Sequence, residues 1–546
     1  MKKKFAVALS ATLLTSAALA GCGKDEKPAS GDKEKKKDQV LNLNVSDEIP
    51  SMDSAISTDE LSFNALINTN EGLYRFGLDG KSRDEGVAID HELSDDGTVY
   101  TFNLRDDAKW SNGDPVTAND FEYAWKRVLD PKTASQYAYI MADIKGADEA
   151  ATGKGSLDDV GVKAIDATTL EVTLKHAAPY FADLMTFPTF FPQNQKFVEA
   201  QGEKYALEAD TNLYNGPFVM TEWVHGTSYQ LKKNDQYWDA KSVKLDTVNN
   251  QVVKDSATDV NLYKTGKADI VPLTSEHIDA FKDKADEFLT VEEPSTFFLR
   301  MNQTNKDLAN VNIRRAIALS IDKDGIVDEI LNNGTTVANY FVPKNFTSSP
   351  SGTDFRELNG DFNAVDKEEA KKYWEQGLKE LGKKSIKLDV SVVDDDVVKK
   401  MSEYLQEQLE SNLTGLKMTI QLMPFKQKLE RETKLDYDTS LGGWGADYVD
   451  PMTFLDMFTT TSSYNQMKFS NAEYDKLIAD AKGPLLSDLE KRYEALLQAE
   501  KILLDEEVAI VPIYQRGRAF AQKAYVKDVV RHQTGGFYTL KWAYIK

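Results

Sequence analysis

The sequence predicts a multidomain α/β protein, and three observations point to this fold class. A chain of 546 residues is too long for one hydrophobic core, so two to four domains are expected. Its composition, 41% hydrophobic and 28% charged, is that of an ordinary globular protein. Segments with strand periodicity also alternate with segments of helix periodicity, which favours α/β domains with mixed sheets. The clearest such series is 388–393, 397–413, 418–422 and 439–444.

The composition also argues against several functions. The net charge of −22 disfavours nucleic-acid binding, which needs a cationic surface. Cys22 is the only cysteine, so neither an intrachain disulfide nor a cysteine-based metal site can form. The 5 histidines are far apart in the sequence and include no His-x-x-x-His or His-x-His pair. We therefore expect no metal ion, no cofactor and no nucleic-acid partner.

The N-terminal segment predicts export. Three lysines precede an apolar run over 5–20 that ends in small residues, as in a secretory signal peptide. The run is short for a membrane span, and a permanent anchor helix is the alternative. Leu-Ala-Gly-Cys at 19–22 resembles the lipobox of bacterial lipoproteins. That resemblance implies a signal peptide over 1–21, cleavage before Cys22 and acylation of its thiol, with palmitate among the attached chains. Residues 22–39 would then be the lipidated cysteine and a disordered tether.

The body of the chain begins with clear local signals. Residues 40–45 and 98–105 alternate apolar and polar side chains, which predicts half-buried strands. Thr117 is a predicted helix N-cap with Asp120 in capping-box position, and an apolar helix face follows. Residues 302–350 contain several polar clusters, so a loop-rich stretch is predicted there.

The stretch 438–451 combines a predicted strand, three glycines around Trp444 and a turn at Asp450-Pro451. Glycines let a backbone approach a ligand closely. Asp450 is the predicted N-cap of an apolar helix, and Pro451 its first residue. Asp447 lies between the glycines and this helix, where we expect its carboxylate to meet a ligand cation. A surface or capping aspartate is the alternative.

Several longer blocks carry a family resemblance. They are 71–80, 98–127, 160–174, 215–218, 233–238, 311–316 and 444–451. In this order they resemble the extracytoplasmic solute-binding lipoproteins of ABC importers, in the cluster that binds oligopeptides, dipeptides and nickel. The likeness is strongest to the oligopeptide-binding proteins of Gram-positive bacteria, and it runs from about residue 41 to the C-terminus.

The resemblance implies a fold and a domain order. The fold would be periplasmic-binding-protein-like (class II, cluster C): bilobal with an extra domain, built on mixed sheets, and closing by a hinge over the ligand. The ligand would lie between domains I and III. The implied bounds are 40–72, 197–297 and 515–546 for domain I, 73–196 for domain II and 298–514 for domain III.

The resemblance also implies how a ligand is held. An extended oligopeptide would hydrogen-bond through its backbone, which gives affinity without sequence preference, and its α-ammonium would pair with Asp447. The other residues that match ligand contacts of the family are Trp444, Gly443, Gly445, Tyr137, Phe425 and Phe298, the last with its neighbour Phe297. Each of these could instead be a bend or ordinary packing. Some relatives carry arginines at the positions of Leu441 and Glu432, so the anchoring of the peptide C-terminus stays open.

The expected partners are an oligopeptide, the permease and ATPase subunits of an ABC transporter, and the membrane through the N-terminal lipid. We expect a monomer on the outer face of a Gram-positive cell membrane, without catalytic residues. A receptor for pheromone or murein peptides would have the same fold, and a nickel or haem receptor fits less well. An exported hydrolase is the alternative class, because Asp438, Asp447 and Asp450 are clustered. No Gly-x-Ser-x-Gly or His-Glu-x-x-His motif supports it.

Overall fold

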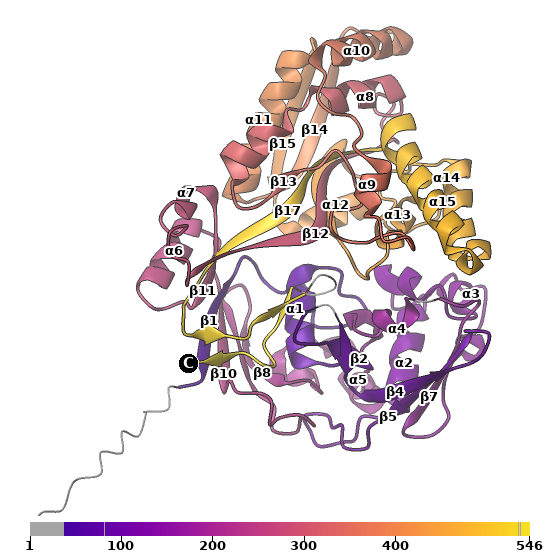
Figure 1. Cartoon of the computed structure of the whole chain (residues 1–546), viewed down its shortest axis with the longest axis vertical. Helices are drawn as coiled ribbons and strands as arrows, with labels where there is room; N and C mark the ends of the chain where they lie inside the picture. The colour runs from indigo at the N-terminus through magenta and orange to yellow at the C-terminus, as the bar shows by residue number, and fades with distance from the viewer. Residues whose placement is uncertain (1–37, 81, 179, 533, 535–536) are drawn as a thin grey trace, which may run out of the picture. The chain divides into compact units, whose positions relative to one another are not determined.

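The computed structural model in Figure 1 describes residues 38–80, 82–178, 180–532, 534 and 537–546. The predicted signal peptide, Cys22 and the tether up to residue 37 lie outside the described residues. Residues 38–546 form one unit. Within the described part of the chain, no helix is both long and apolar enough to cross a membrane.

Most of the fold is organised on an 11-stranded mixed sheet. Two long antiparallel strands, β12 (Phe288–Met301) and β17 (Ile510–Gln522), lie at its centre and join two groups of strands. Their register shifts between Glu292 and Thr296, where the ladder is locally irregular. Figure 1 shows both strands passing from one group to the other.

The first group of strands is β14 (Ile386–Val393), β15 (Leu416–Met423) and β16 (Thr439–Gly445). β14 pairs in parallel with both of its neighbours, and β16 pairs antiparallel with β12. The helices of this region are α8 (Val311–Ser320), α10 (Lys367–Leu381) and α11 (Asp396–Asn412). Their apolar faces share a core with these strands, in which Leu388, Val390 and Leu405 are buried.

The second group of strands is β1 (Val40–Val45), β8 (Phe218–Val224), β9 (Ser228–Lys233), β10 (Thr247–Val252) and β11 (Ile270–Leu273). β1 pairs in parallel with β10 and β11. The chain returns to this group at its end, where Gln39 Nε2 donates to the carbonyl of Ile545 at 2.8 Å. Helix α1 (Glu60–Thr69) packs near the same strands.

A separate antiparallel sheet is built from four strands in the order β4 (Ala88–Leu93), β5 (Val99–Leu104), β7 (Thr169–Thr173) and β6 (Val162–Ala164). Helix α2 (Ala118–Leu129) packs against it. The predicted capping box at Thr117 and Asp120 is confirmed: the Asp120 carboxylate accepts from the Thr117 backbone N–H at 2.7 Å.

Comparison with the predicted elements shows where local signals suffice. The six predicted segments 40–45, 98–105, 388–393, 397–413, 418–422 and 439–444 agree with β1, β5, β14, α11, β15 and β16 to within about two residues at each end. The loop-rich prediction for 302–350 is wrong in part, because α8 and the helix η6 (Gly325–Leu331) lie within it. Asn310 caps α8 by accepting from two backbone N–H groups, and apolar side chains such as Ile313 pack it into the core.

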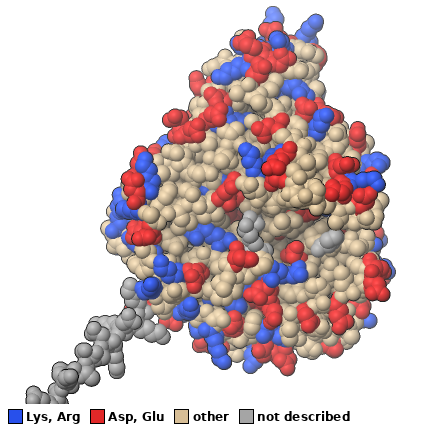
Figure 2. Space-filling view, viewed as in Figure 1, with Lys and Arg blue, Asp and Glu red and all other residues tan. Residues whose placement is uncertain are grey.

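Basic and acidic side chains are interspersed on the face of the protein shown in Figure 2. On that face the acidic side chains are therefore mixed with basic ones and do not form a single acidic patch. Electrostatic recognition of a small ligand then depends on the charges that line individual cavities.

Candidate functional site

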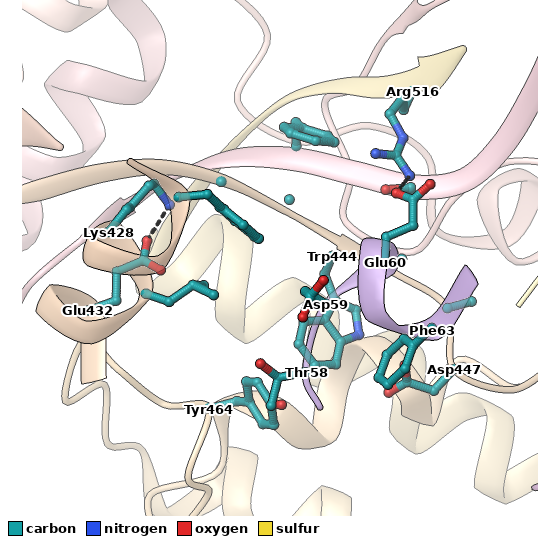
Figure 3. Close-up of a pocket in the computed structure, with 18 of the residues that line it drawn as sticks. Thr58, Asp59, Glu60, Phe63, Lys428, Glu432, Trp444, Asp447, Tyr464 and Arg516 are labelled. Atoms are coloured by element: carbon teal, nitrogen blue, oxygen red, sulfur yellow. Dashed lines mark hydrogen bonds and ion pairs between the residues drawn. The ribbon is translucent and has the colours of Figure 1, made fainter. Parts of the chain in front are cut away.

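A cavity of about 300 Å³ lies where segments distant in sequence converge (Figure 3). Its walls come from the start of α1, from η1 (Gln136–Met141), from β12 and β16, from α12 (Phe425–Thr433) and from the loop after β16. The charged residues along it include Asp59, Glu60, Glu293, Arg300, Lys428, Glu432, Asp447 and Arg516.

Asp447 lies in the loop after β16, with only 6% of its surface exposed. The hydroxyl groups of Tyr137 and Tyr139 donate to its carboxylate at 3.2 and 3.3 Å. Its backbone N–H donates to Thr453 Oγ1 at 2.9 Å. Among the described residues, no Lys, Arg or His forms an ion pair with this carboxylate. The carboxylate is therefore oriented by hydroxyl groups alone.

The environment of Asp447 disfavours its charged form. Burial raises the pKa of its carboxyl well above the ordinary value, Tyr137 and Tyr139 oppose the shift by hydrogen bonding, and the nearby Asp456 adds to it. A buried ionised carboxylate is costly unless a cation meets it. A ligand ammonium at this position would supply the positive charge and favour the ionised form of the Asp447 carboxyl.

Trp444 and its neighbouring glycines shape the wall next to Asp447. The Trp444 indole N–H donates to the carbonyl of Thr453 at 2.8 Å, so Thr453 braces both Trp444 and Asp447. Gly443 and Gly445 are exposed on β16, whereas Trp444 is buried. A Cβ on Gly443 would lie 2.6 Å from the ring of Phe297, so only glycine lets the two strands approach this closely here.

Tyr137 and Phe425, for which the resemblance implied ligand contact, also line the cavity. Tyr137 is buried and stacks on Tyr139 with their ring centroids 5.7 Å apart. Phe425 begins α12 and faces both this cavity and a neighbouring one. The second tyrosine was missed from the sequence, although the spacing of two residues between the pair was visible there.

The prediction for Phe298 requires a correction. Adjacent residues of a strand point to opposite faces, and of this pair only Phe297 faces the cavity. Phe297 lines it, whereas Phe298 is 1% exposed and packs edge-on against Phe341 and Phe458 in the core. Phe297 therefore takes the position that the resemblance assigned to Phe298.

A four-charge cluster lies beside the irregular part of the β12–β17 ladder, with Glu293 buried and Glu60, Arg516 and Arg518 partly exposed. Arg518 Nη2 contacts Glu60 at 2.7 Å, Arg516 Nη2 contacts Glu60 at 3.0 Å, and both arginines also pair with Glu293. Burial alone would raise the pKa of Glu60, but Arg518 and Arg516 lower it to about 2. The two positive and two negative charges of this cluster cancel.

A second charged cluster lies at the α12 side of the cavity. Lys428 Nζ donates to Glu432 Oε1 at 2.7 Å, and Arg300 Nη1 lies 3.5 Å from the same oxygen. Although burial alone would raise the pKa of Glu432, Lys428 and Arg300 lower it to about 2, so this group is ionised at neutral pH. Burial lowers the pKa of Lys428, and the contact with Glu432 opposes that shift.

Sequence reasoning noticed Glu432 and Leu441 only as positions where arginine is missing. The structure brings two other cations, Arg300 and Lys428, into the same region. The spacing of four residues between Lys428 and Glu432 on one helix was a visible signal, because such residues are neighbours on a helix surface. Arg300 could not be placed without knowing which strand pairs with β16.

A second cavity of about 580 Å³ adjoins the first. The two share seven of the residues that line them, which are Glu60, Phe297, Val393, Val398, Phe425, Arg516 and Phe537. The second cavity extends toward β11, the end of β1 and the start of α11. A ligand that leaves the first cavity between Arg516 and Phe425 would therefore enter the second.

Comparison with known proteins places this architecture in a family. Residues 85–466 match the bacterial extracellular solute-binding proteins, family 5. The chain is 38% identical to a dipeptide-binding protein of Bacillus subtilis over 533 residues, 96% of each chain. It superposes on the substrate-binding domain of an oligopeptide ABC transporter from Bacillus anthracis with a TM-score of 0.91 and 48% identity, covering 94% of this chain and 99% of that one.

The fold also resembles that of Listeria monocytogenes OppA bound to peptide, with a TM-score of 0.89 and 44% identity over 94% of this chain and 100% of the other. This chain belongs to the family 5 bacterial extracellular solute-binding proteins, and it has their periplasmic-binding-protein-like fold.

Proposed function

We propose that this protein captures oligopeptides in the cavity beside Asp447 and delivers them to an ABC importer. The relatives named for peptide binding support this function across nearly the full chain. The observation that carries it is the buried carboxylate of Asp447, held by two tyrosine hydroxyl groups and by no described cation. A free peptide α-ammonium is the ligand group that matches it.

The edge of β16 offers a second reason to expect a peptide. β16 pairs with β12 along its whole length, but its other edge pairs with β14 only at Thr439 and Ser440. From Leu441 to Gly445 that edge has no partner strand among the described residues. An extended peptide can bind such an edge through its main chain, and affinity gained this way is largely independent of side chains.

The proposed ammonium site is tested by Asp447→Asn, which removes the charge and keeps the shape of the side chain. Isothermal titration with a free pentapeptide should show a loss of about 2–5 kcal/mol in binding free energy, because the peptide ammonium would be buried without a counter-charge. Wild-type protein should also discriminate against the N-acetylated form of that peptide, whereas the variant should not.

Asp436→Asn is the matched control, because Asp436 is an exposed aspartate just before β16 and does not line the cavity. It should bind the pentapeptide as wild type does. Unchanged affinity in Asp447→Asn, or equal binding of free and acetylated peptides by wild type, would reject the ammonium site.

The anchoring and domain organisation are part of the same proposal. We infer acylation of Cys22, attachment to the outer face of a Gram-positive cell membrane, and a monomer with the three-domain division given above. Strands β12 and β17, which link the two strand groups, fit a connection between domains I and III. Metabolic labelling with a palmitate analogue should mark the wild type and leave Cys22→Ala unlabelled.

Binding without catalysis is also proposed, in keeping with the binding proteins that it resembles. Asp450, one of the aspartates that suggested a hydrolase, forms a two-point ion pair with Arg492 at 2.8 Å for each contact. A turnover assay with peptides should show no hydrolysis. Hydrolysis that disappears in Asp447→Asn would favour the enzyme instead.

A further inference from the structure

A group of lysines lies at the end of the main sheet where β1 begins. Val40, the first residue of β1, pairs with Thr247 of β10, and Thr247 pairs with Lys232 of β9. Lys233 follows as the last residue of β9. The strand register therefore places both lysines beside the point at which the chain enters the folded body from the predicted tether.

The C-terminal segment brings further lysines to the same end. Lys523 follows the last residue of β17, which pairs antiparallel with β11 and ends where β11 begins. Two short strands, β18 (Val526–Lys527) and β21 (Tyr544–Ile545), pair just beyond it. The bond from Gln39 to the carbonyl of Ile545 holds this pair beside the start of β1. Figure 1 shows the C-terminus next to β1 and β10.

Aromatic rings contact two of the cations at this end. Lys244 Nζ lies 4.1 Å from the centroid of the Tyr544 ring, and Lys523 Nζ lies 3.8 Å from that of Tyr263. Such contacts attract a cation without cancelling its charge. We call the exposed and partly exposed lysines at this end of the sheet the lysine edge; it consists of Lys232, Lys233, Lys244, Lys523, Lys527 and Lys546.

The lysine edge has a surplus of positive charge in an acidic protein. Among the residues that the structure describes, none of its members forms an ion pair with a carboxylate, whereas exposed lysines elsewhere do, such as Lys371 and Lys417. The segments that build the edge are also basic. Residues 232–246 contain four lysines and three aspartates, and residues 523–546 contain four lysines, one arginine and one aspartate. The chain as a whole carries a net charge of −22.

The adjoining tether is basic too, and its length keeps the lysine edge close to the proposed lipid anchor. Residues 33–37 are four lysines and one glutamate. The segment from Cys22 to Val40 would span about 60 Å when extended. As the coil that its composition predicts, it would span about 21–25 Å. An acylated Cys22 would therefore present the edge to the membrane at high effective concentration, so that a weak attraction suffices.

We propose that the lysine edge docks on the anionic phospholipid head groups of the membrane that holds the lipid anchor. This inference rests on the proposed acylation of Cys22. Basic side chains are attracted to an anionic membrane within a screening length of about 8 Å at physiological ionic strength. The acidic remainder of the protein is repelled by the same surface, so the charges select the edge as the face that meets the lipid.

Docking of the lysine edge sets an orientation for the whole protein. The second cavity is lined by Asn44 and Val45, at the opposite end of β1 from Val40. With the edge against the lipid, the peptide-binding region therefore lies on the side of the sheet that is away from the bilayer. A protein held in this way would capture peptides that arrive from outside the cell.

The test follows the distance of the edge from a bilayer in the whole acylated protein. Cys22 is the only cysteine, so Ala524→Cys, at an exposed position between Lys523 and Tyr525, carries a single fluorophore once Cys22 is acylated. The protein is bound to phosphatidylcholine vesicles with or without one third phosphatidylglycerol. Nitroxide lipids should quench the fluorophore about twofold more on the anionic vesicles. At 1 M salt, where the screening length is about 3 Å, this difference should vanish.

The residues are tested with the triple variant Lys232→Gln/Lys244→Gln/Lys527→Gln. Its matched control, Lys379→Gln/Lys384→Gln/Lys387→Gln, removes the same charge from exposed lysines on and after α10, in the other strand group. The first variant should be quenched equally on both kinds of vesicle, whereas the control should keep the wild-type difference. Both should bind peptide as wild type does, because neither changes a residue that lines the cavities.

Three results would overturn the docking. They are equal quenching of wild type on both kinds of vesicle, a difference that survives in the lysine-edge variant, and tighter binding of the edge to dissolved polyglycerol phosphate than to anionic vesicles. The last result would assign the edge to an anionic cell-wall polymer. Flotation separates these results from failure of the anchor: wild type that floats with neither kind of vesicle lacks the lipid, and the docking inference is then overturned together with the acylation.

Discussion

At the scale of single residues, Asp447 was predicted from its motif, and the structure explains why such a residue suits a cationic ligand. Its burial and its two tyrosine donors are consequences of tertiary packing, since Tyr137 and Tyr139 lie more than 300 positions away in the chain. The same packing brings Arg300 beside Lys428. Local patterns cannot reveal such pairs. For that reason Asp447 was predicted as a cavity residue, whereas Arg300 and Lys428 were not.

The raised pKa of Asp447 predicts a pH dependence of peptide binding. Burial raises the pKa of Asp447 in the free protein, whereas a bound ammonium favours the ionised form, so below the free-state pKa binding is coupled to the release of a proton. Affinity for a peptide without charged side chains should fall by about tenfold per pH unit below that pKa. It should also fall above about pH 8, where the peptide α-amino group loses its proton.

Titrations from pH 4.5 to 9 in the wild type and in Asp447→Asn measure this dependence. The variant should lose both limbs, because without the Asp447 carboxylate the charge of the peptide amino group no longer favours binding. An acidic limb that is equally steep in both proteins would assign it to another group.

At the scale of elements, the sequence predicted those helices and strands whose limits depend on residues close by in the chain. The capping box of α2 and the alternating pattern of β5 are examples, since both depend on neighbours within a few residues. The helix expected after Asp450 is shorter, with α13 limited to Met452–Leu455. Asp450 does accept from the Met452 N–H at 2.9 Å, but it also binds Arg492 of α15 (Leu489–Lys501), and this tertiary contact could not be predicted.

The buried carboxylate of Glu500 connects several elements, so its removal should lower the stability of the fold. It is fully buried on α15, pairs with Arg356 of α9 (Phe355–Asn359), and accepts from the backbone N–H groups of Phe341 and Val342. Glu500→Ala should lower the free energy of unfolding by about 3–5 kcal/mol, because it leaves Arg356 buried without its partner. Urea unfolding measures the loss.

The matched control for that measurement is Glu494→Ala, which removes an exposed carboxylate from the same helix. Its effect should stay within about 0.5 kcal/mol. A loss of similar size in both variants would mean that helix propensity or net charge, and not the buried ion pair, dominates.

At the scale of the whole molecule, the mixed sheet and the α/β class were predictable, but the central position of β12 and β17 was not. These strands are more than 200 residues apart in sequence, and their pairing depends on the path of the entire chain. They link the strand group that contains β16 to the group that contains β1. Tyr137 meets Asp447 across segments that approach each other only through this arrangement. A ligand held between them should therefore stabilise the folded chain as a unit.

This coupling predicts both closure and stabilisation on peptide binding. At a peptide concentration of 100 times the dissociation constant, the free energy of unfolding should rise by about 2.7 kcal/mol. Small-angle scattering should show a smaller radius of gyration in the presence of peptide, because the hinge closes over the ligand in this fold. Asp447→Asn should show smaller changes at that peptide concentration and the full changes at a concentration raised in proportion to its weaker affinity. Stabilisation without compaction would mean that the peptide binds to a chain that is already closed.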